Sequence, residues 1–154
     1  MTGLFNISEA LSIAIHLCIR LTRQPGDFCS TRRIADEFGF SVHHVAKVVQ
    51  KLVRGGIIET VRGIQGGARL AGDPAGITLL AIAGSLDETP PKGCLLNSSI
   101  CDGGRCLLGR AIRERNEQMR AIMGRTTLRE VADSLNPAFN RHTPRRGQRG
   151  KQAS

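Results

Sequence analysis

The stretch that decides the fold is STRRIADEFGFSVHHVAKVVQKLVRGGIIETVRGIQGGARL, residues 30–70. Its first part predicts a short helix over residues 31–38, because Ser30 or Thr31 can accept hydrogen bonds from the free N–H groups of a first helical turn. Gly39 breaks this helix, since glycine readily adopts the backbone conformation of a helix stop. We therefore expect a compact helix followed by a sharp turn.

A second helix follows the turn. Ser41 caps its start, and Gly55 with Gly56 ends it. Apolar residues recur within it at three- and four-residue steps, the spacing that gives a helix one apolar face: Val42, Val45, Val48, Val49, Leu52 and Val53.

Two short strands come next, over residues 57–61 and 68–70, and the glycine-rich residues 62–67 join them. Helix, glycine-containing turn, helix and hairpin is the layout of a winged helix-turn-helix, whose second helix enters the major groove of DNA. The sequence therefore predicts a mainly α fold with a two-stranded wing. The loop is no P-loop, because it lacks the Gly-Lys-Ser/Thr ending and lies in a hairpin.

The second helix carries charge of one sign. No Asp or Glu occurs between Ser41 and Ile58, and the basic and histidine side chains must point outward if the valines face the core. An arginine in the wing is suited to a narrow minor groove. A merely solvated face is the alternative, but the acid-free helix and the wing occur together. The candidate DNA contacts are Ser41, His43, His44, Lys47, Lys51, Arg62 and Gln65.

Length and composition exclude several classes of protein. The chain has 154 residues, about one domain, and a formal net charge of +9, which favours an anionic partner. Aromatic residues make up 3%, with no Trp or Tyr, which argues against base-stacking platforms for single strands. No stretch reaches the ~20 apolar residues of a membrane span, and Glu9 interrupts the N-terminal apolar run. We expect a cytoplasmic protein with no membrane partner.

Helices are also expected on both sides of this motif, over residues 5–21, 77–86 and 107–123, the last roughly 25 Å long. Thr127 and Glu130 form a capping-box pattern that opens a final short helix. We therefore divide the chain into a winged helix-turn-helix domain at 1–88, a cysteine-bearing loop at 89–106, a long and a short helix at 107–136, and a basic tail at 137–154. The tail holds too few apolar residues to offset its ordering entropy, so we expect disorder there.

Three cysteines, Cys94, Cys101 and Cys106, fall within one short loop before the long helix. Thiolates bind zinc and iron–sulfur clusters, and the helix dipole stabilises a thiolate at the position of Cys106. The paired CxxC spacing of zinc ribbons is absent. Metal binding is favoured over unligated thiols or a disulfide switch. The other residues of this kind are expected to be structural: Cys18, Cys29 and His16.

Taken together, these features resemble a known family, the bacterial iron–sulfur winged-helix regulators of the IscR and NsrR type. The resemblance covers nearly all of residues 3–135. It rests on the first helix, the end of the helix pair, the wing, the cysteine loop and the last helix: Leu4, Ser8, Glu9 and Leu11; Gly55-Gly56-Ile57-Ile58; residues 61–70; Cys94, Cys101 and Cys106; residues 127–131.

The resemblance implies a homodimer in which residues 107–136 supply the dimerisation helix. It implies that the three cysteines hold an iron–sulfur cluster, with 4Fe-4S favoured over 2Fe-2S. Glu9 of the partner subunit falls at the position of the acidic fourth ligand of nitric-oxide-sensing members, where Asp is usual. The histidine ligand of IscR-type members would fall at Gly109, so the chain is more similar to the NsrR type. The cysteine spacing is less even than in the family.

The leading hypothesis is a homodimeric DNA-binding transcriptional repressor whose operator binding is controlled by an iron–sulfur cluster that senses nitric oxide, or redox or iron status. One alternative is a clusterless regulator of the same fold that responds to thiol oxidation or a ligand. Another is a zinc-stabilised adaptor that binds protein. An enzyme is not expected, because the histidines are scattered and no nucleophile, base and orienting group are brought together.

Overall fold

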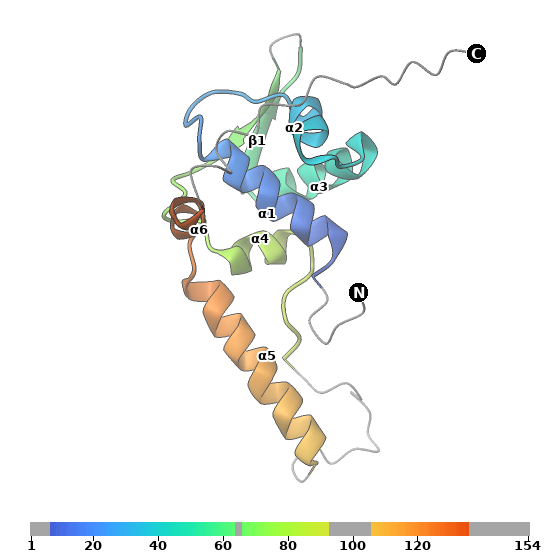
Figure 1. Ribbon diagram of the computed structural model, residues 1–154, viewed down its shortest axis with the longest axis vertical. Coiled ribbons are helices and arrows are strands. Elements are labelled where there is room, and N and C mark those ends of the chain that lie inside the picture. Colours follow the sequence, from blue (N-terminus) through green and yellow to red (C-terminus); the bar gives the residue numbers. More distant parts are fainter. Residues whose placement is uncertain (1–6, 64–65, 93–105, 136–154) are drawn as a thin grey trace, which may run out of the picture.

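The computed structural model describes residues 7–63, 66–92 and 106–135. Figure 1 shows the N-terminal helices and the sheet gathered into one body, with a long helix extending away from it. The mainly α fold with a two-stranded wing agrees with the sequence prediction. In chain order the elements are α1 (Glu9–Leu21), α2 (Thr31–Phe38), α3 (Val42–Arg54), β1 (Ile58–Val61), β2 (Gly67–Leu70), α4 (Leu79–Ser85), α5 (Leu107–Arg125) and α6 (Leu128–Ser134).

The helix-turn-helix of α2 and α3 has the local chemistry that its sequence predicts. The Ser30 hydroxyl oxygen accepts a hydrogen bond from the Arg33 backbone N–H at 3.4 Å and caps α2. Gly39 ends α2 with a positive φ of 71°, a conformation that favours glycine. The Phe40 N–H then donates to the Ala35 carbonyl at 2.9 Å, which closes the turn.

The buried stripe of α3 is narrower than expected. Val45, Val48 and Leu52 are buried, whereas Val42 and Val53 are 43% and 38% exposed. At about 100° per residue, the three buried positions span about 60° of the helix, and the two exposed valines lie about 90° and 110° from the middle of that span. The expected six-residue apolar face was therefore too wide.

The wing is an antiparallel pair in which Ile58 lies opposite Leu70. Backbone hydrogen bonds of 2.9 and 2.8 Å between Cys29 and Ala68 join β2 to the segment before α2. A Cβ on Gly67 would lie 2.2 Å from the Cys29 carbonyl oxygen, so the close approach requires glycine here. The strand bounds differ from the expected ones by one residue at one end of each strand.

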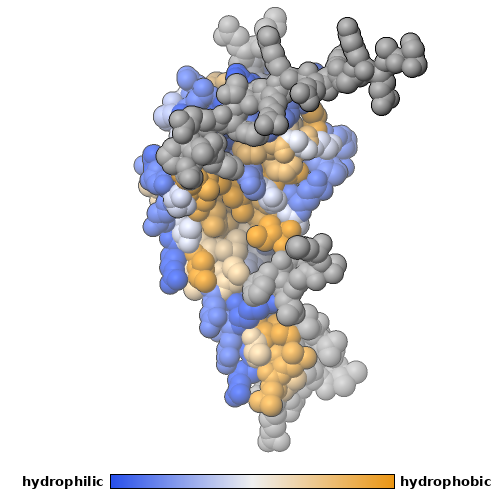
Figure 2. Space-filling view, in the orientation of Figure 1, coloured by the Kyte–Doolittle hydropathy of each residue, from blue (hydrophilic) through white to orange (hydrophobic). Residues whose placement is uncertain are grey.

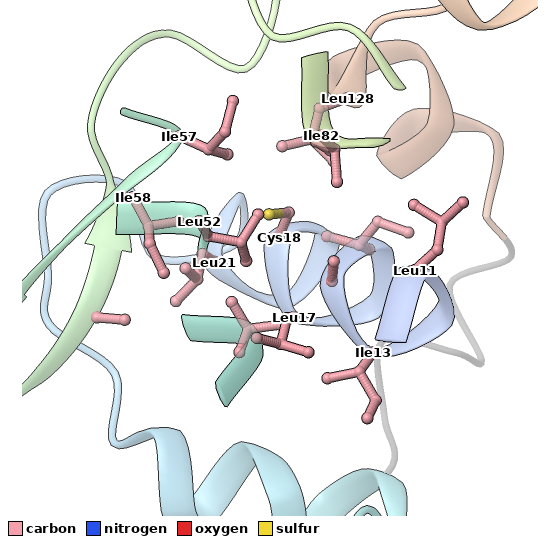
Figure 3. Packing of buried hydrophobic residues seen from close by; sticks show 14 of the residues in the cluster. Leu11, Ile13, Leu17, Cys18, Leu21, Leu52, Ile57, Ile58, Ile82 and Leu128 are labelled. Atoms are coloured by element: carbon pink, nitrogen blue, oxygen red, sulfur yellow. The ribbon is translucent and has the colours of Figure 1, made fainter. Parts of the chain in front are cut away.

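The core is built around α1. Ile13, Leu17 and Leu21 are almost completely buried, and each such side chain contributes about 1.5–3 kcal/mol relative to exposure to water. Figure 3 shows the α1 side chains between those of α3, the wing, α4 and α6. The buried residues that these elements contribute include Leu52, Ile57, Ile58, Ile82 and Leu128.

The first helix begins later than the sequence analysis expects. The Ser8 hydroxyl accepts a hydrogen bond from the Leu11 N–H at 3.0 Å, and the helix starts at Glu9. Apolar recurrence placed the start at residue 5, because the recurrence includes Ile7, which lies outside the helix. A capping serine with an acidic first residue is the better signal.

The C-terminal helices follow the sequence prediction closely. α5 starts at Leu107 as expected and continues two residues beyond the expected end, to Arg125. The capping box of Thr127 and Glu130 is present in full at the start of α6. None of the helices in the described ranges is long and apolar enough to cross a membrane. Four parts of the expected site and architecture lie outside the described residues: residues 5–6 of the expected first helix, Gln65, residues 93–105 with Cys94 and Cys101, and the tail at 137–154.

Candidate functional site

The outward face of α3 is the first part of the candidate site. His43, Lys47 and Arg54 lie about 130° to 170° from the middle of the buried stripe, and all three are exposed. No acidic residue occurs on α3. This face presents imidazole, ammonium and guanidinium groups, which match the phosphate oxygens and the acceptor atoms of base edges in DNA.

Ser41 occupies the N-cap position of α3, but its side chain makes no capping hydrogen bond. The expected side-chain cap is therefore absent, and the turn is closed by the Val45 N–H, which donates to the Ser41 carbonyl at 2.9 Å. The side chain is exposed at the end of the helix that would meet DNA first. A hydroxyl in this place can donate to a phosphate oxygen.

His44 lies on the flank of α3 rather than on its outward face. Its Nδ1 is 3.5 Å from Oε1 of Glu9, the first residue of α1, and the two side chains are 51% and 64% exposed. The pair borders a cavity of about 220 Å³ between α1 and α3. The other residues that line it are Ala10, Ile13, Lys47 and Val48.

Lys51 lies on the same flank, and its ammonium group is engaged within the protein. Nζ donates a hydrogen bond to the Leu86 carbonyl at 3.1 Å, and Leu86 is the C-cap of α4. A lysine at the carbonyl end of a helix satisfies a free carbonyl and interacts favourably with the helix dipole. Lys51 therefore ties α3 to α4.

The wing contributes one exposed cation to the candidate site. Arg62 is exposed after β1, next to Gly63, whose φ of 120° favours glycine. Arg69 on β2 is different, because it pairs with Glu59 at 2.5 Å and lies 4.6 Å from the centre of the Phe28 ring. We therefore regard Arg69 as a support for the wing.

Sequence reasoning missed a basic pair on α2. Arg32 and Arg33 are exposed in the first turn after the Ser30 cap, and Arg33 borders a cavity of about 540 Å³. Basic side chains are unfavourable at the positive end of a helix, so two consecutive arginines there call for a reason other than helix stability. The unfavourable position of these two arginines was the sequence signal that could have predicted a basic contact on α2.

Cys106 has the position predicted for a thiolate at a helix end. It is the N-cap of α5, and its Sγ accepts a hydrogen bond from the Gly109 N–H at 3.3 Å. A backbone N–H directed at sulfur stabilises a thiolate ligand. Within residues 7–63, 66–92 and 106–135, no three His, Cys, Asp or Glu side chains gather as a metal site. Figure 1 shows the start of α5 at the far end of that helix from the body that contains α1.

Two other cysteines and one histidine are structural, as expected. Burial raises the pKa of the Cys18 thiol from 9.0 to about 12, and burial is also the main cause that raises the pKa of Cys29. His16 Nδ1 lies 2.7 Å from the Ser12 carbonyl oxygen, within hydrogen-bonding distance. Cys18 and Cys29 are therefore buried core residues, and His16 is half-buried.

A family model for Rrf2, described as iron-dependent transcriptional regulator, matches residues 7–134, a range that includes all the helices and strands described above. The chain belongs to the Rrf2 family. It is therefore a DNA-binding transcriptional regulator and not an enzyme, in agreement with the sequence analysis.

Several curated relatives of this Rrf2 protein are regulators. It is 36% identical over 83 residues to the protein named HTH-type transcriptional regulator BadM of Rhodopseudomonas palustris, an alignment that covers 54% of this chain and about half, 53%, of BadM. It is 35% identical over 105 residues to NsrR of Geobacillus kaustophilus, covering 66% and 69% of the two chains. It is 25% identical over 133 residues to IscR of Yersinia enterocolitica, covering 86% and 77%.

Solved structures show the same fold. CymR, the global cysteine regulator of B. subtilis, has a TM-score of 0.73 at 21% identity, covering 86% of this chain and 100% of that one. IscR of T. potens has a TM-score of 0.71 at 18% identity, covering 88% and 91%. At these identities the likeness establishes the winged-helix architecture of an Rrf2 protein.

Proposed function

We propose that this Rrf2 protein is a homodimeric repressor whose operator binding is controlled by an iron–sulfur cluster, with nitric oxide as the favoured signal and redox or iron status as the alternatives. The observation that carries the proposal is the acid-free outward face of α3 next to the wing. The cluster is supported by Cys106 at the start of α5 and by the description of the family as iron-dependent.

In the proposed complex, α3 lies in the major groove and the wing approaches the neighbouring minor groove. Ser41, His43 and Lys47 belong to the first half of α3, the part of a recognition helix that reaches base edges. The wing adds Arg62 and Gln65. His44 and Lys51 border this surface and contact α1 and α4 respectively.

The exposed side of α5 supports dimerisation through this helix. Leu107 and Leu108 are 73% and 64% exposed, and Ile122 is 44% exposed. Figure 2 shows apolar side chains gathered along one side of the part of α5 that extends from the body. Apolar surface of this kind favours burial against another protein surface, and a second copy of α5 presents the same surface. The proposed dimer therefore pairs α5 of one subunit with α5 of the other.

The donor set fits an iron–sulfur cluster. Cys94, Cys101 and Cys106 would supply three thiolates, and Glu9 of the partner subunit would supply a carboxylate. Two observations support this set: an N–H directed at the Cys106 sulfur, and a carboxylate of Glu9 that is 64% exposed and thus open to a second subunit. A bound cluster supplies a core that reacts with nitric oxide and oxidants.

Residues 86–90 run from the end of α4 into the cysteine-bearing loop and are hydrogen-bonded to α3, to the cap of α1 and to α5. These bonds connect the loop physically to α3. A change in the position of these residues would act directly on α3, because Lys51 on α3 is hydrogen-bonded to Leu86. Three side chains make the connection: Lys51 donates to the Leu86 carbonyl, Ser8 donates to the Glu88 carboxylate, and Arg120 donates to the Pro90 carbonyl. Recognition helices must keep a separation of about 34 Å in a dimer, so a small shift lowers affinity.

Anaerobic purification tests the proposal. We expect coloured protein that contains iron and acid-labile sulfide, and we expect nitric oxide to bleach the colour and release, in parallel, a duplex selected from a randomised library. Cys94→Ala, Cys101→Ala and Cys106→Ala should each lose iron, whereas the matched core variant Cys18→Ala should retain it, because Cys18 is completely buried.

The same purification distinguishes the alternatives. Colourless protein that binds DNA and responds to thiol oxidation would indicate the clusterless regulator. One zinc ion per chain without iron or sulfide, together with partner binding that is insensitive to salt, would indicate the zinc-stabilised adaptor.

A further inference from the structure

A cavity of about 540 Å³ lies at the foot of the wing, separate from the outward face of α3. Its walls come from the end of α1, the segment before α2, the first turn of α2 and the base of the wing. A volume of this size is within the range of ligand sites. Its polar walls include Arg20, Gln24, Asp27, Ser30, Arg33 and Gly66.

The frame of this cavity is fixed by the main chain. The two backbone hydrogen bonds between Cys29 and Ala68, at 2.9 and 2.8 Å, hold the base of the wing against the residue before Ser30. The close contact at Gly67 brings the two segments together without a side chain between them. These backbone contacts fix the position of the wing base relative to the start of α2.

Two arginines line the cavity, Arg20 and Arg33, and they differ in their ion pairs. Arg20 is paired with Glu37 at 3.0 Å. Among the described residues, no carboxylate lies within ion-pair distance of Arg33. Asp27 borders the same cavity and opposes an anion, but it is exposed, so water screens its charge.

We propose that this cavity binds a phosphate group of the DNA backbone through the Arg33 guanidinium and the Ser30 hydroxyl. Guanidinium groups bind phosphate with two parallel hydrogen bonds, and Ser30 can donate its O–H while its oxygen caps α2. The inference rests on the proposed DNA-binding function. It assigns to α2 a contact that lies outside the recognition helix.

The DNA backbone is the favoured source of the phosphate because of where the cavity lies. In a helix-turn-helix the first helix crosses the backbone while the second enters the groove, and α2 is that first helix. Gly66 in the cavity wall belongs to the wing loop, which borders the duplex on the other side. A free phosphate offers the same chemistry and is the other source to be tested.

The test compares four proteins by fluorescence anisotropy on a labelled duplex of about 30 base pairs of mixed sequence, long enough for two half-sites about 34 Å apart. Arg33→Gln should weaken binding about 5- to 10-fold at low salt, and should reduce the slope of log affinity against log salt by about 1. Asp27→Asn should change affinity in the opposite direction, by about 2-fold. Arg129→Gln, which loses the same charge on α6, should leave both quantities unchanged.

The outcomes separate this inference from the proposed function. If the wild type binds the duplex and Arg33→Gln matches Arg129→Gln, the phosphate site is wrong while DNA binding stands. If Asp27→Asn binds more weakly than the wild type, the arrangement of charges is also wrong. If the wild type binds no duplex, both proposals fail.

A second measurement distinguishes the source of the phosphate. Thermal unfolding is compared in sodium phosphate and in sodium chloride of equal ionic strength. A stabilisation by inorganic phosphate that Arg33→Gln abolishes, with unchanged DNA affinity, would assign the cavity to a free anion and overturn the DNA assignment. No stabilisation together with the expected loss of DNA affinity would support the backbone phosphate.

Discussion

Nδ1 of His44 in the first turn of α3 lies 3.5 Å from Oε1 of Glu9 at the start of α1. The contact joins a candidate DNA-binding residue to a candidate cluster ligand. Both side chains are more than half exposed, so the contact itself contributes at most about 1 kcal/mol to stability. A Glu9 carboxylate that binds the cluster of a second subunit would no longer contact His44. The proposed ligand role of Glu9 and its contact with His44 therefore compete.

We expect substitutions of these two residues to separate the two roles. Glu9→Gln should lower the iron content of anaerobically purified protein, because a neutral amide is a poor ligand for iron. The melting temperature of the cluster-free protein should change by less than about 4 °C, since an exposed ion pair contributes at most about 1 kcal/mol. His44→Gln should keep the iron and weaken DNA binding roughly 3- to 10-fold. Iron analysis and fluorescence anisotropy measure the two effects. Full iron content in Glu9→Gln would contradict the assignment of Glu9 as a ligand.

The two lysines of α3 should behave differently. Lys47→Met should weaken DNA binding about tenfold and change stability by less than about 0.5 kcal/mol, because its side chain is exposed. Lys51→Met removes the hydrogen bond to the Leu86 carbonyl and should lower the free energy of unfolding by about 1 kcal/mol. Urea unfolding and anisotropy on both variants test this contrast. Equal stability of the two variants would show that the Lys51 bond contributes nothing to the fold.

The contrast between these lysines shows what the sequence could predict about the site. Charge and apolar recurrence placed His43, His44 and Lys47 away from the core, and all three side chains are exposed. Helical geometry adds that His44 and Lys51 lie about 70° and 90° from the middle of the buried stripe, so they are flank residues. Which groups meet them depends on how α1 and α4 pack on α3, and the sequence of α3 carries no information on that.

The fold was more predictable than the site because its signals are local. Ser30, Gly39 and the capping box of Thr127 act within one helical turn, and the structure confirmed each of them. The start of α1 was wrong because apolar recurrence continues beyond a helix, while a cap marks its end. The basic pair of Arg32 and Arg33 was not predicted, because the absence of acidic residues points to α3 and carries no information on the first turn of α2.

Dimerisation through α5 is testable by a change on its exposed face. Leu107 and Leu108 are largely exposed, so the double variant Leu107→Gln/Leu108→Gln should keep the stability of the winged body and weaken self-association. Sedimentation velocity at several protein concentrations measures the association. The matched control is Leu128→Ala, a completely buried residue, which should cost about 2–5 kcal/mol of stability. A double variant that remains dimeric at all concentrations would place the interface elsewhere.

The Cys18 thiol should make the stability of the protein fall at alkaline pH. Burial raises its pKa from 9.0 to about 12, so the unfolded chain loses this proton at lower pH than the folded protein does. The stabilisation is therefore fully present below pH 9.0 and is lost as the pH rises from there toward about 12. Urea unfolding in the presence of a reductant should show a steeper decline above pH 9.0 for the wild type than for Cys18→Ala.

The control for this prediction is Cys106→Ala, since that thiol lies at the start of α5 and is only partly buried. It should follow the wild-type decline, because its loss leaves the Cys18 proton in place. In folded protein without a cluster, iodoacetamide at about pH 8 should also modify Cys106 and reach Cys18 only after unfolding, because alkylation requires an accessible thiolate. Parallel pH curves for wild type and Cys18→Ala would mean that water or a local opening lets the buried thiol ionise without unfolding.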